Sequence, residues 1–194
     1  MVDTSVNLLR RLRHEPDDEA WRRLVELYTP FIHGWLRPHF LSAAETDDLT
    51  QEVLAVVVRE LPRFEHNGRS GAFRHWLRTT TAHRLRDYWR SRRYRPQATG
   101  DSEFQKQLEE LEDPSSDLSR QWDQEHDRHV VASLLERLRP AFEPLTWQAF
   151  RAVMLDGESP AAAAARLNMS VNAVLLAKSR VLRRLRQEAE GLVE

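Results

Sequence analysis

Apolar residues recur at helical spacing along most of the chain. Between residues 17 and 36 they lie three and four positions apart, which is the pattern of an amphipathic helix. Pro30 predicts a break or kink near the end of this helix, because proline lacks the N–H that a helix needs. Residues 72–93 predict another helix, with a hinge or loop at the three consecutive threonines 79–81, whose β-branched side chains lower helix propensity. Six glycines are few for a protein rich in sheets and tight turns, so the pattern predicts an all-α fold.

The helix expected between these two has clear ends and two distinct faces. Ser42 and Glu45 form a candidate capping box, Thr46 is a rival N-cap, and Pro62 ends the helix near residue 61. Its apolar stripe predicts a core face: Leu49, Val53, Val56, Val57 and Leu61. A second stripe follows the same helical spacing on another face: Asp48, Gln51, Glu52, Ala55 and Arg59.

The end of the chain carries the most specific local signals. Ser159 is a good N-cap with Pro160 as the first helical residue, and Asn168 can take the left-handed conformation that a tight turn requires. Ser170 then caps a second, basic helix that runs to about Glu188. A short helix, a tight turn and a longer basic helix are typical of a helix-turn-helix, whose second helix can enter a major groove. An ordinary helical hairpin with a solvated basic face is the alternative.

Charge is segregated along the chain although the net charge is only −1. Residues 1–95 hold 17 basic and 13 acidic residues (net +4), residues 96–129 hold 3 and 10 (net −7), and residues 130–194 hold 9 and 7 (net +2). This alternation predicts two helical domains joined by a flexible acidic linker, with at most one short helix at residues 104–111. Within residues 69–95 there are nine arginines and one acid, Asp87, which is a candidate footprint for a polyanion.

Several classes of protein are excluded by what the sequence lacks. The chain has no run of about 18 apolar residues, so no membrane span is expected. No apolar leader precedes the first charges, and we therefore expect a cytoplasmic protein. The absence of cysteine excludes disulfides and thiolate sites. Phosphate-binding, dinucleotide-binding and HExxH motifs are missing, and His126 with His129 has no evident third metal ligand. We therefore expect no enzyme, no catalytic residue, no metal and no cofactor.

Three segments in order carry a resemblance to a known family. They are TDDLTQEV at residues 46–53, FRHWL at residues 73–77 followed by Thr79 and Asp87, and residues 155–186 with their closing RRLR. Together they resemble an extracytoplasmic-function sigma factor of bacterial RNA polymerase. The resemblance implies region 2 at residues 1–95, an acidic linker at residues 96–129 and a helix-turn-helix region 4 at residues 130–194. That linker is either a solvated tether or a segment that threads the active-centre cleft of the polymerase.

The resemblance also implies which residues make contacts. The surface for core polymerase would be Asp48, Gln51, Glu52 and Arg59. The residues for the minus-ten promoter element would be Trp76, His83, Arg86, Tyr88, Trp89, Arg90 and Arg93. The residues for the minus-thirty-five element would be Asn172, Ala173, Leu176, Lys178, Arg180, Arg183 and Arg184. Core RNA polymerase and promoter DNA are the expected partners, and an anti-sigma factor is left open as a third.

Two positions depart from the family's pattern. His83 stands where many members carry asparagine, and Leu175-Leu176-Ala177 stands where members often carry Lys-Ser-Arg. Apolar side chains can contact thymine methyl groups but cannot make the bidentate contacts of arginine with guanine. Two other functions stay open beside a sigma factor: a stand-alone helix-turn-helix regulator, which would bind DNA without polymerase, and a protein-binding adaptor, whose basic faces would meet acidic partners.

Overall fold

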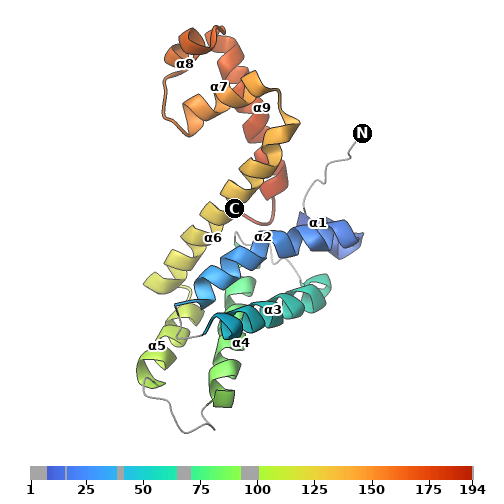
Figure 1. Ribbon diagram of the computed structural model, residues 1–194, viewed down its shortest axis with the longest axis vertical. Coiled ribbons are helices and arrows are strands. Elements are labelled where there is room, and N and C mark those ends of the chain that lie inside the picture. Colours follow the sequence, from blue (N-terminus) through green and yellow to red (C-terminus); the bar gives the residue numbers. More distant parts are fainter. Residues whose placement is uncertain (1–7, 16, 39–41, 65–70, 93–100, 194) are drawn as a thin grey trace. The chain divides into compact units, whose positions relative to one another are not determined.

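The computed structural model describes residues 8–15, 17–38, 42–64, 71–92 and 101–193. Over these ranges the chain forms nine α-helices, two short 3-10 helices and no strand, which confirms the predicted all-α class (Figure 1). The chain divides into two compact units, Met1–Val130 with Gly191–Glu194 and Val131–Glu190. No helix in the described ranges is long and apolar enough to cross a membrane.

The first unit is built from six helices and the shared start of a long one. They are α1 (Leu8–His14), α2 (Asp18–Leu36), α3 (Ala43–Glu60), the 3-10 helix η1 (Leu61–Arg63), α4 (Ala72–Arg92), α5 (Asp101–Glu112) and α6 (Asp117–Leu138), which enters the second unit at residue 131. Helix α3 begins at the predicted capping box: the Glu45 N–H donates to Ser42 Oγ (3.3 Å) and the Ser42 N–H donates to the Glu45 carboxylate (2.8 Å). Leu49, Val53 and Val57 lie in the core as predicted.

The predicted break at Pro30 and the predicted hinge or loop at residues 79–81 do not occur. Helix α2 continues through Pro30, and Phe31, Ile32 and Leu36 beyond it are buried. Burying one such side chain contributes about 1.5–3 kcal/mol, so the three together outweigh the roughly 3 kcal/mol that an internal proline costs. Helix α4 is likewise unbroken at its threonines, because Thr80 and Thr81 are buried in the first unit. The three hydroxyls are satisfied within the helix, each donating to the carbonyl oxygen four residues earlier at 2.9–3.0 Å.

The prediction of a flexible acidic linker is wrong for the residues that the structure describes. Residues 101–112 and 117–129 are helical, within α5 and α6, and they belong to the first unit. Along α6 a buried stripe at helical spacing packs into the core: Ser119, Trp122, His126 and Val130. This buried stripe holds the segment in the first unit although the segment is acidic, because the charged residues of α6 lie on the other faces of the helix. Residues 96–100 of the predicted linker lie outside the described residues.

The second unit contains the predicted helix pair. After η2 (Arg139–Ala141) come α7 (Pro144–Met154), α8 (Pro160–Leu167) and α9 (Val171–Ala189). Its core is made largely of alanines from α7, α8 and α9, which allow close approach of the three helices. Ser159 and Ser170 cap α8 and α9 by accepting from the N–H groups of Ala162 and Ala173. Asn168 takes the left-handed conformation (φ 53°, ψ 44°), as predicted for the turn between them.

Candidate polymerase and nucleic-acid interface

Helix α3 presents the polar stripe of the sequence analysis to solvent. The side chains that the stripe comprises are all exposed: Asp48, Gln51, Glu52, Ala55 and Arg59. The opposite face holds Leu49 and Val53 in the core, so the helix is fixed while the stripe stays accessible. Arg59 pairs with the neighbouring Glu60 (2.8 Å), an exposed contact that holds the pKa of Glu60 below its ordinary value. The stripe is a continuous surface of both charge signs.

The second half of α4 carries most of the residues predicted to contact the minus-ten element. Arg90 is the most exposed of its described arginines, with 69% of its side chain accessible, and it lies 3.9 Å from Asp87. The Tyr88 and Trp89 rings are partly buried and meet edge to face, with centroids 6.0 Å apart. Arg93 lies outside the described residues. The described residues of this half therefore offer a cation and two aromatic rings on neighbouring positions.

Trp76 lies in the first half of α4 and is held there by other rings. Its centroid is 5.2 Å from that of Phe64 and 5.7 Å from that of Phe73, which is fully buried. The indole is itself only partly buried. Trp76 thus packs at the margin of the core, and the structure does not bring it together with Tyr88 and Trp89.

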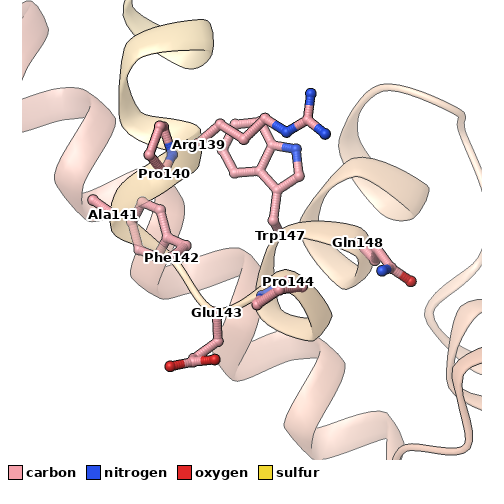
Figure 2. A pocket seen from close by; sticks show the side chains of 8 residues that line it. All are labelled: Arg139, Pro140, Ala141, Phe142, Glu143, Pro144, Trp147 and Gln148. Carbon is pink, nitrogen blue, oxygen red and sulfur yellow. The ribbon is translucent and has the colours of Figure 1, made fainter.

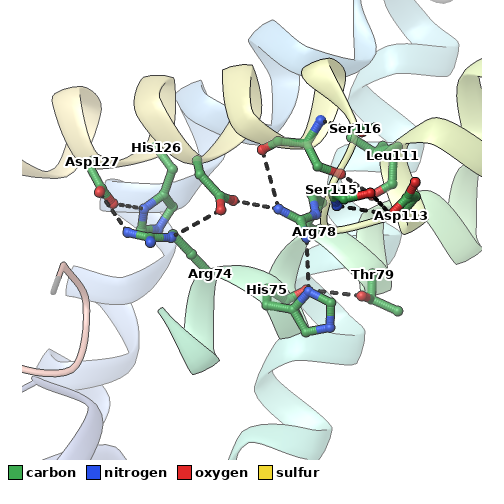
Figure 3. Close-up of polar contacts among 12 residues, drawn as sticks. Arg74, His75, Arg78, Thr79, Leu111, Asp113, Ser115, Ser116, His126 and Asp127 are labelled. Atoms are coloured by element: carbon green, nitrogen blue, oxygen red, sulfur yellow. Dashed lines mark hydrogen bonds and ion pairs between the residues drawn. The ribbon is translucent and has the colours of Figure 1, made fainter. Parts of the chain in front are cut away.

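Two arginines of α4 serve the fold, and sequence reasoning missed their role (Figure 3). Arg78 is almost fully buried, and its guanidinium donates to Asp123 Oδ1 (2.5 Å), to the Ser119 carbonyl oxygen (3.3 Å) and to His75 Nδ1 (2.9 Å). Arg74 lies beside it and pairs with Asp127 (2.6 Å) and Asp123 (3.4 Å). These ion pairs fasten α4 to α6. The signal that could have revealed them is the helical stripe of α6, which places Asp123 and Asp127 at a fixed edge of the buried face.

His126 is buried in the same layer and bonds on both sides. Its Nδ1 lies 3.0 Å from Asp127 Oδ1 and its Nε2 lies 3.2 Å from the Tyr28 hydroxyl. Burial lowers the pKa of His126 more than the neighbouring Asp127 raises it, so the ring is neutral. Because the Asp127 carboxylate can only accept, Nδ1 carries the proton and Nε2 accepts from Tyr28. Burial, with the Asp127 charge, raises the pKa of Tyr28 well above its ordinary value, which keeps the phenol a donor.

His129, the other imidazole considered for a metal, is also engaged by the fold. Its Nε2 donates to the Leu27 carbonyl oxygen at 2.7 Å. Among the described residues no group of three or more histidine and carboxylate side chains is placed to hold a metal ion. The histidines of α6 are therefore structural in the part of the chain that the structure describes.

Glu112, in the last turn of α5, links the acidic segment to the predicted promoter surface. Its Oε1 lies 2.5 Å from Arg86 Nη1 and 3.4 Å from His83 Nε2. Arg86 keeps 24% of its side chain accessible, whereas His83 keeps 54%. Arg86 is thus held by a protein carboxylate, and Arg90 one turn further on is the more available cation.

Helix α9 exposes one face that changes character along its length. Its first two turns expose Val171, Asn172, Leu175 and Leu176, and its later turns expose Ser179, Arg180, Arg183 and Arg186. Val174, Ala177 and Val181 point into the alanine core. Ala173 and Lys178 are half-buried, and Arg184 pairs with the buried Glu188 (3.0 Å), so these predicted residues lie at the edge of the exposed face.

An open pocket of about 770 Å³ lies in the second unit where η2 leads into α7. Figure 2 shows its lining, which includes the Arg139 side chain and the Trp147 indole. Trp147 also packs on Phe142 (6.3 Å) and Phe150 (5.3 Å). Arg139 and Glu143 are the charged side chains of this lining, and it contains no nucleophile beside a general base.

Comparison with known proteins finds a family similarity within the first unit. Residues 24–95 match the family model described as Sigma-70 region 2. This match covers the α3 stripe and the whole described length of α4. No curated protein matches the chain. This stretch of the chain is therefore similar to region 2 of the sigma-70 family, and the similarity supports a role as a sigma factor in promoter recognition by RNA polymerase.

Proposed function

We propose that the protein is a two-domain sigma factor of the extracytoplasmic-function class. It binds core RNA polymerase through α3, engages the minus-ten element through α4 and anchors upstream through α9. It has no catalysis of its own and directs the polymerase to promoters. The observation that carries the proposal is the helix-turn-helix of α8 and α9, which follows region 2 along the same chain.

The proposed polymerase surface is the α3 stripe. Its residues are accessible, lie within the matched region 2 and make no contribution to the core, which suits a docking face. Asp48 and Gln51 lie one turn apart near its acidic end. A substitution of both changes the surface without disturbing Leu49 and Val53 beneath it.

The proposed minus-ten surface is the second half of α4. Single-stranded bases need aromatic platforms and the phosphates need cations. Tyr88, Trp89 and Arg90 supply both within one turn of helix. His83 and Arg86 extend the surface toward Glu112, whose carboxylate lies close to both side chains.

The test is binding of the full chain to purified bacterial core RNA polymerase. We expect nanomolar-class binding that Asp48→Arg with Gln51→Ala abolishes while the circular dichroism spectrum is unchanged. Arg86→Ala with Arg90→Ala is the matched control: it should retain polymerase binding and lose promoter opening. Arg90→Ala alone should also retain polymerase binding and weaken promoter opening, and it leaves the Arg86–Glu112 ion pair in place.

The stand-alone regulator is the second candidate, because a helix-turn-helix can bind a duplex by itself. It predicts tight, sequence-specific DNA binding by the free chain. A folded chain that fails to bind core polymerase but selects a duplex would favour this function and contradict the sigma factor. Loss of polymerase binding in the Arg86/Arg90 variant would contradict the assignment of surfaces.

A further inference from the structure

The recognition helix α9 exposes bulky apolar side chains where it would meet DNA. Val171, Leu175 and Leu176 are 45%, 42% and 48% accessible. The core of the unit is completed without them by Val174, Ala177 and Val181. The fold therefore does not require leucine at positions 175 and 176.

Charge on α9 indicates what covers this apolar end. From Val171 to Gln187 the helix carries five cations and no acid, and Arg180, Arg183 and Arg186 are exposed. In a helix-turn-helix the first turns of the second helix face base edges, while cations position the protein on phosphates. A duplex meets both requirements, because it offers phosphates beside the later turns and base edges beside the first two.

The chemistry of the exposed side chains selects one kind of base pair. Leucine can neither donate nor accept a hydrogen bond, so it would leave the N7 and O6 acceptors of guanine without partners. The thymine C5-methyl group is the apolar group that the major groove presents. Asn172 is exposed one turn before Leu176, and an asparagine amide can bond to N6 and N7 of adenine. Both side-chain types therefore fit A·T pairs.

We infer that Leu175 and Leu176 are specificity-determining residues, which select A·T pairs in the upstream element by packing on thymine methyl groups. This inference rests on the proposed function and names the DNA that α9 takes. It also assigns a role to Leu175, which the resemblance did not include. Arg180 and Arg183 hold the helix on the backbone and carry no sequence preference.

The first experiment identifies the duplex. Holoenzyme assembled from the full chain and bacterial core polymerase selects from a library of random-sequence duplexes. We expect A·T pairs at the positions that α9 covers, located by the bases whose preference changes in Leu175→Ala and Leu176→Ala. Selection of G·C pairs there would overturn the inference.

The second experiment removes the methyl groups alone. Replacing thymine by deoxyuridine in the selected duplex deletes one methyl per base and leaves every hydrogen-bonding group in place. Loss of one buried methyl corresponds to about a fourfold weaker binding. We expect that loss for the unmodified chain and a ratio near one for Leu175→Ala or Leu176→Ala. Leu145→Ala is the matched control, because Leu145 is 47% exposed on α7, and it should keep the unmodified ratio.

The remaining outcomes are separable. Equal binding of thymine and uracil duplexes overturns the inference and leaves the sigma-factor proposal intact. Loss of polymerase binding in the Leu175 or Leu176 variant identifies the apolar end as a protein-docking face and also overturns it. If the unmodified chain binds no polymerase, the proposed function fails. The selection and the uracil comparison are then performed on the free chain, where they test α9 independently.

Discussion

The contact of Arg78 with Asp123 provides the sharpest test of the structural role of α6. Asp123→Ala removes the carboxylate that lies 2.5 Å from a guanidinium with only 2% of its side chain accessible. Arg78 would keep its bonds to the Ser119 carbonyl oxygen and to His75 but would lose its counter-charge. Arg74 would lose its 3.4 Å contact with the same residue and keep Asp127.

The magnitude follows from the burial of the two partners. Removing one member of a buried ion pair costs about 3–5 kcal/mol, because the other charge stays buried and uncompensated. A third of the Asp123 side chain is accessible, so water can reach the site and the cost falls at the low end. Alanine is also the better helix former by about 0.5 kcal/mol. We expect a loss of about 2.5 kcal/mol in the free energy of unfolding of the first unit.

Urea unfolding followed by tryptophan fluorescence measures this loss. Five of the six tryptophans, all except Trp147, lie in the first unit, so the signal reports mainly on it. With a urea dependence of about 2 kcal/mol per molar, the midpoint should fall by roughly 1.2 M. Glu125→Ala is the control: it removes an acid from the same helix, and its surface bond with Gln121 contributes less than about 0.5 kcal/mol.

A second variant distinguishes the ion pair from helix formation in general. Arg78→Met with Asp123→Leu removes both charges and should recover most of the stability, since replacing a buried pair by apolar residues is often close to neutral. The reasoning would be refuted if Asp123→Ala shifted the midpoint no more than Glu125→Ala does. That result would mean that residues 117–129 form a helix without fastening α4.

Two further predictions concern other parts of the fold. Burial lowers the pKa of His126, and burial with the Arg78 charge lowers that of His75. Below the ordinary histidine pKa of about 6.5, the unfolded chain therefore binds more protons than the folded chain. The free energy of unfolding should fall as pH drops from 7.5 to 5.5. His126→Asn should be less stable at pH 7.5 yet lose less on acidification, and a variant with an unchanged pH slope would contradict this explanation. Asn168→Ala should destabilise the second unit by about 1 kcal/mol because its φ is 53°, whereas Asn168→Gly should not; amide hydrogen exchange in α8 and α9 measures both, and equal protection in the two variants would count against the strain.

Features encoded by neighbouring residues could be predicted from the sequence. The Ser42–Glu45 capping box, the Ser159 and Ser170 caps and the left-handed Asn168 each depend on contacts within a few positions. The exposed α3 stripe follows from helical spacing alone. In each case the interacting residues lie within one turn or one helix, so both can be recognised from the local sequence.

The predictions that were wrong involve partners far apart along the chain. The residues that hold α6, such as Tyr28 against His126, are separated by up to about a hundred positions. Composition indicated a tether at residues 96–129 because ten acids stand beside three cations. The arginines that pair with Glu112, Asp123 and Asp127 are in α4, so a count confined to the segment could not include them. At Pro30 and at the threonines of α4, tertiary packing likewise outweighs local helix propensity.

The burial of Trp122 and His126 also bears on how the chain acquires its fold during synthesis. Domains generally fold as units while the chain leaves the ribosome, with the N-terminal part first. The segment that matches region 2 ends at residue 95, but Tyr28, Phe31 and Arg78 have their partners between residues 119 and 129. The nascent first unit must therefore wait, with an apolar face of α2 uncovered, until the amino-terminal part of α6 has emerged. A translational pause before the amino-terminal part of α6 has emerged would prolong that exposed state, whereas a pause after it has emerged would not.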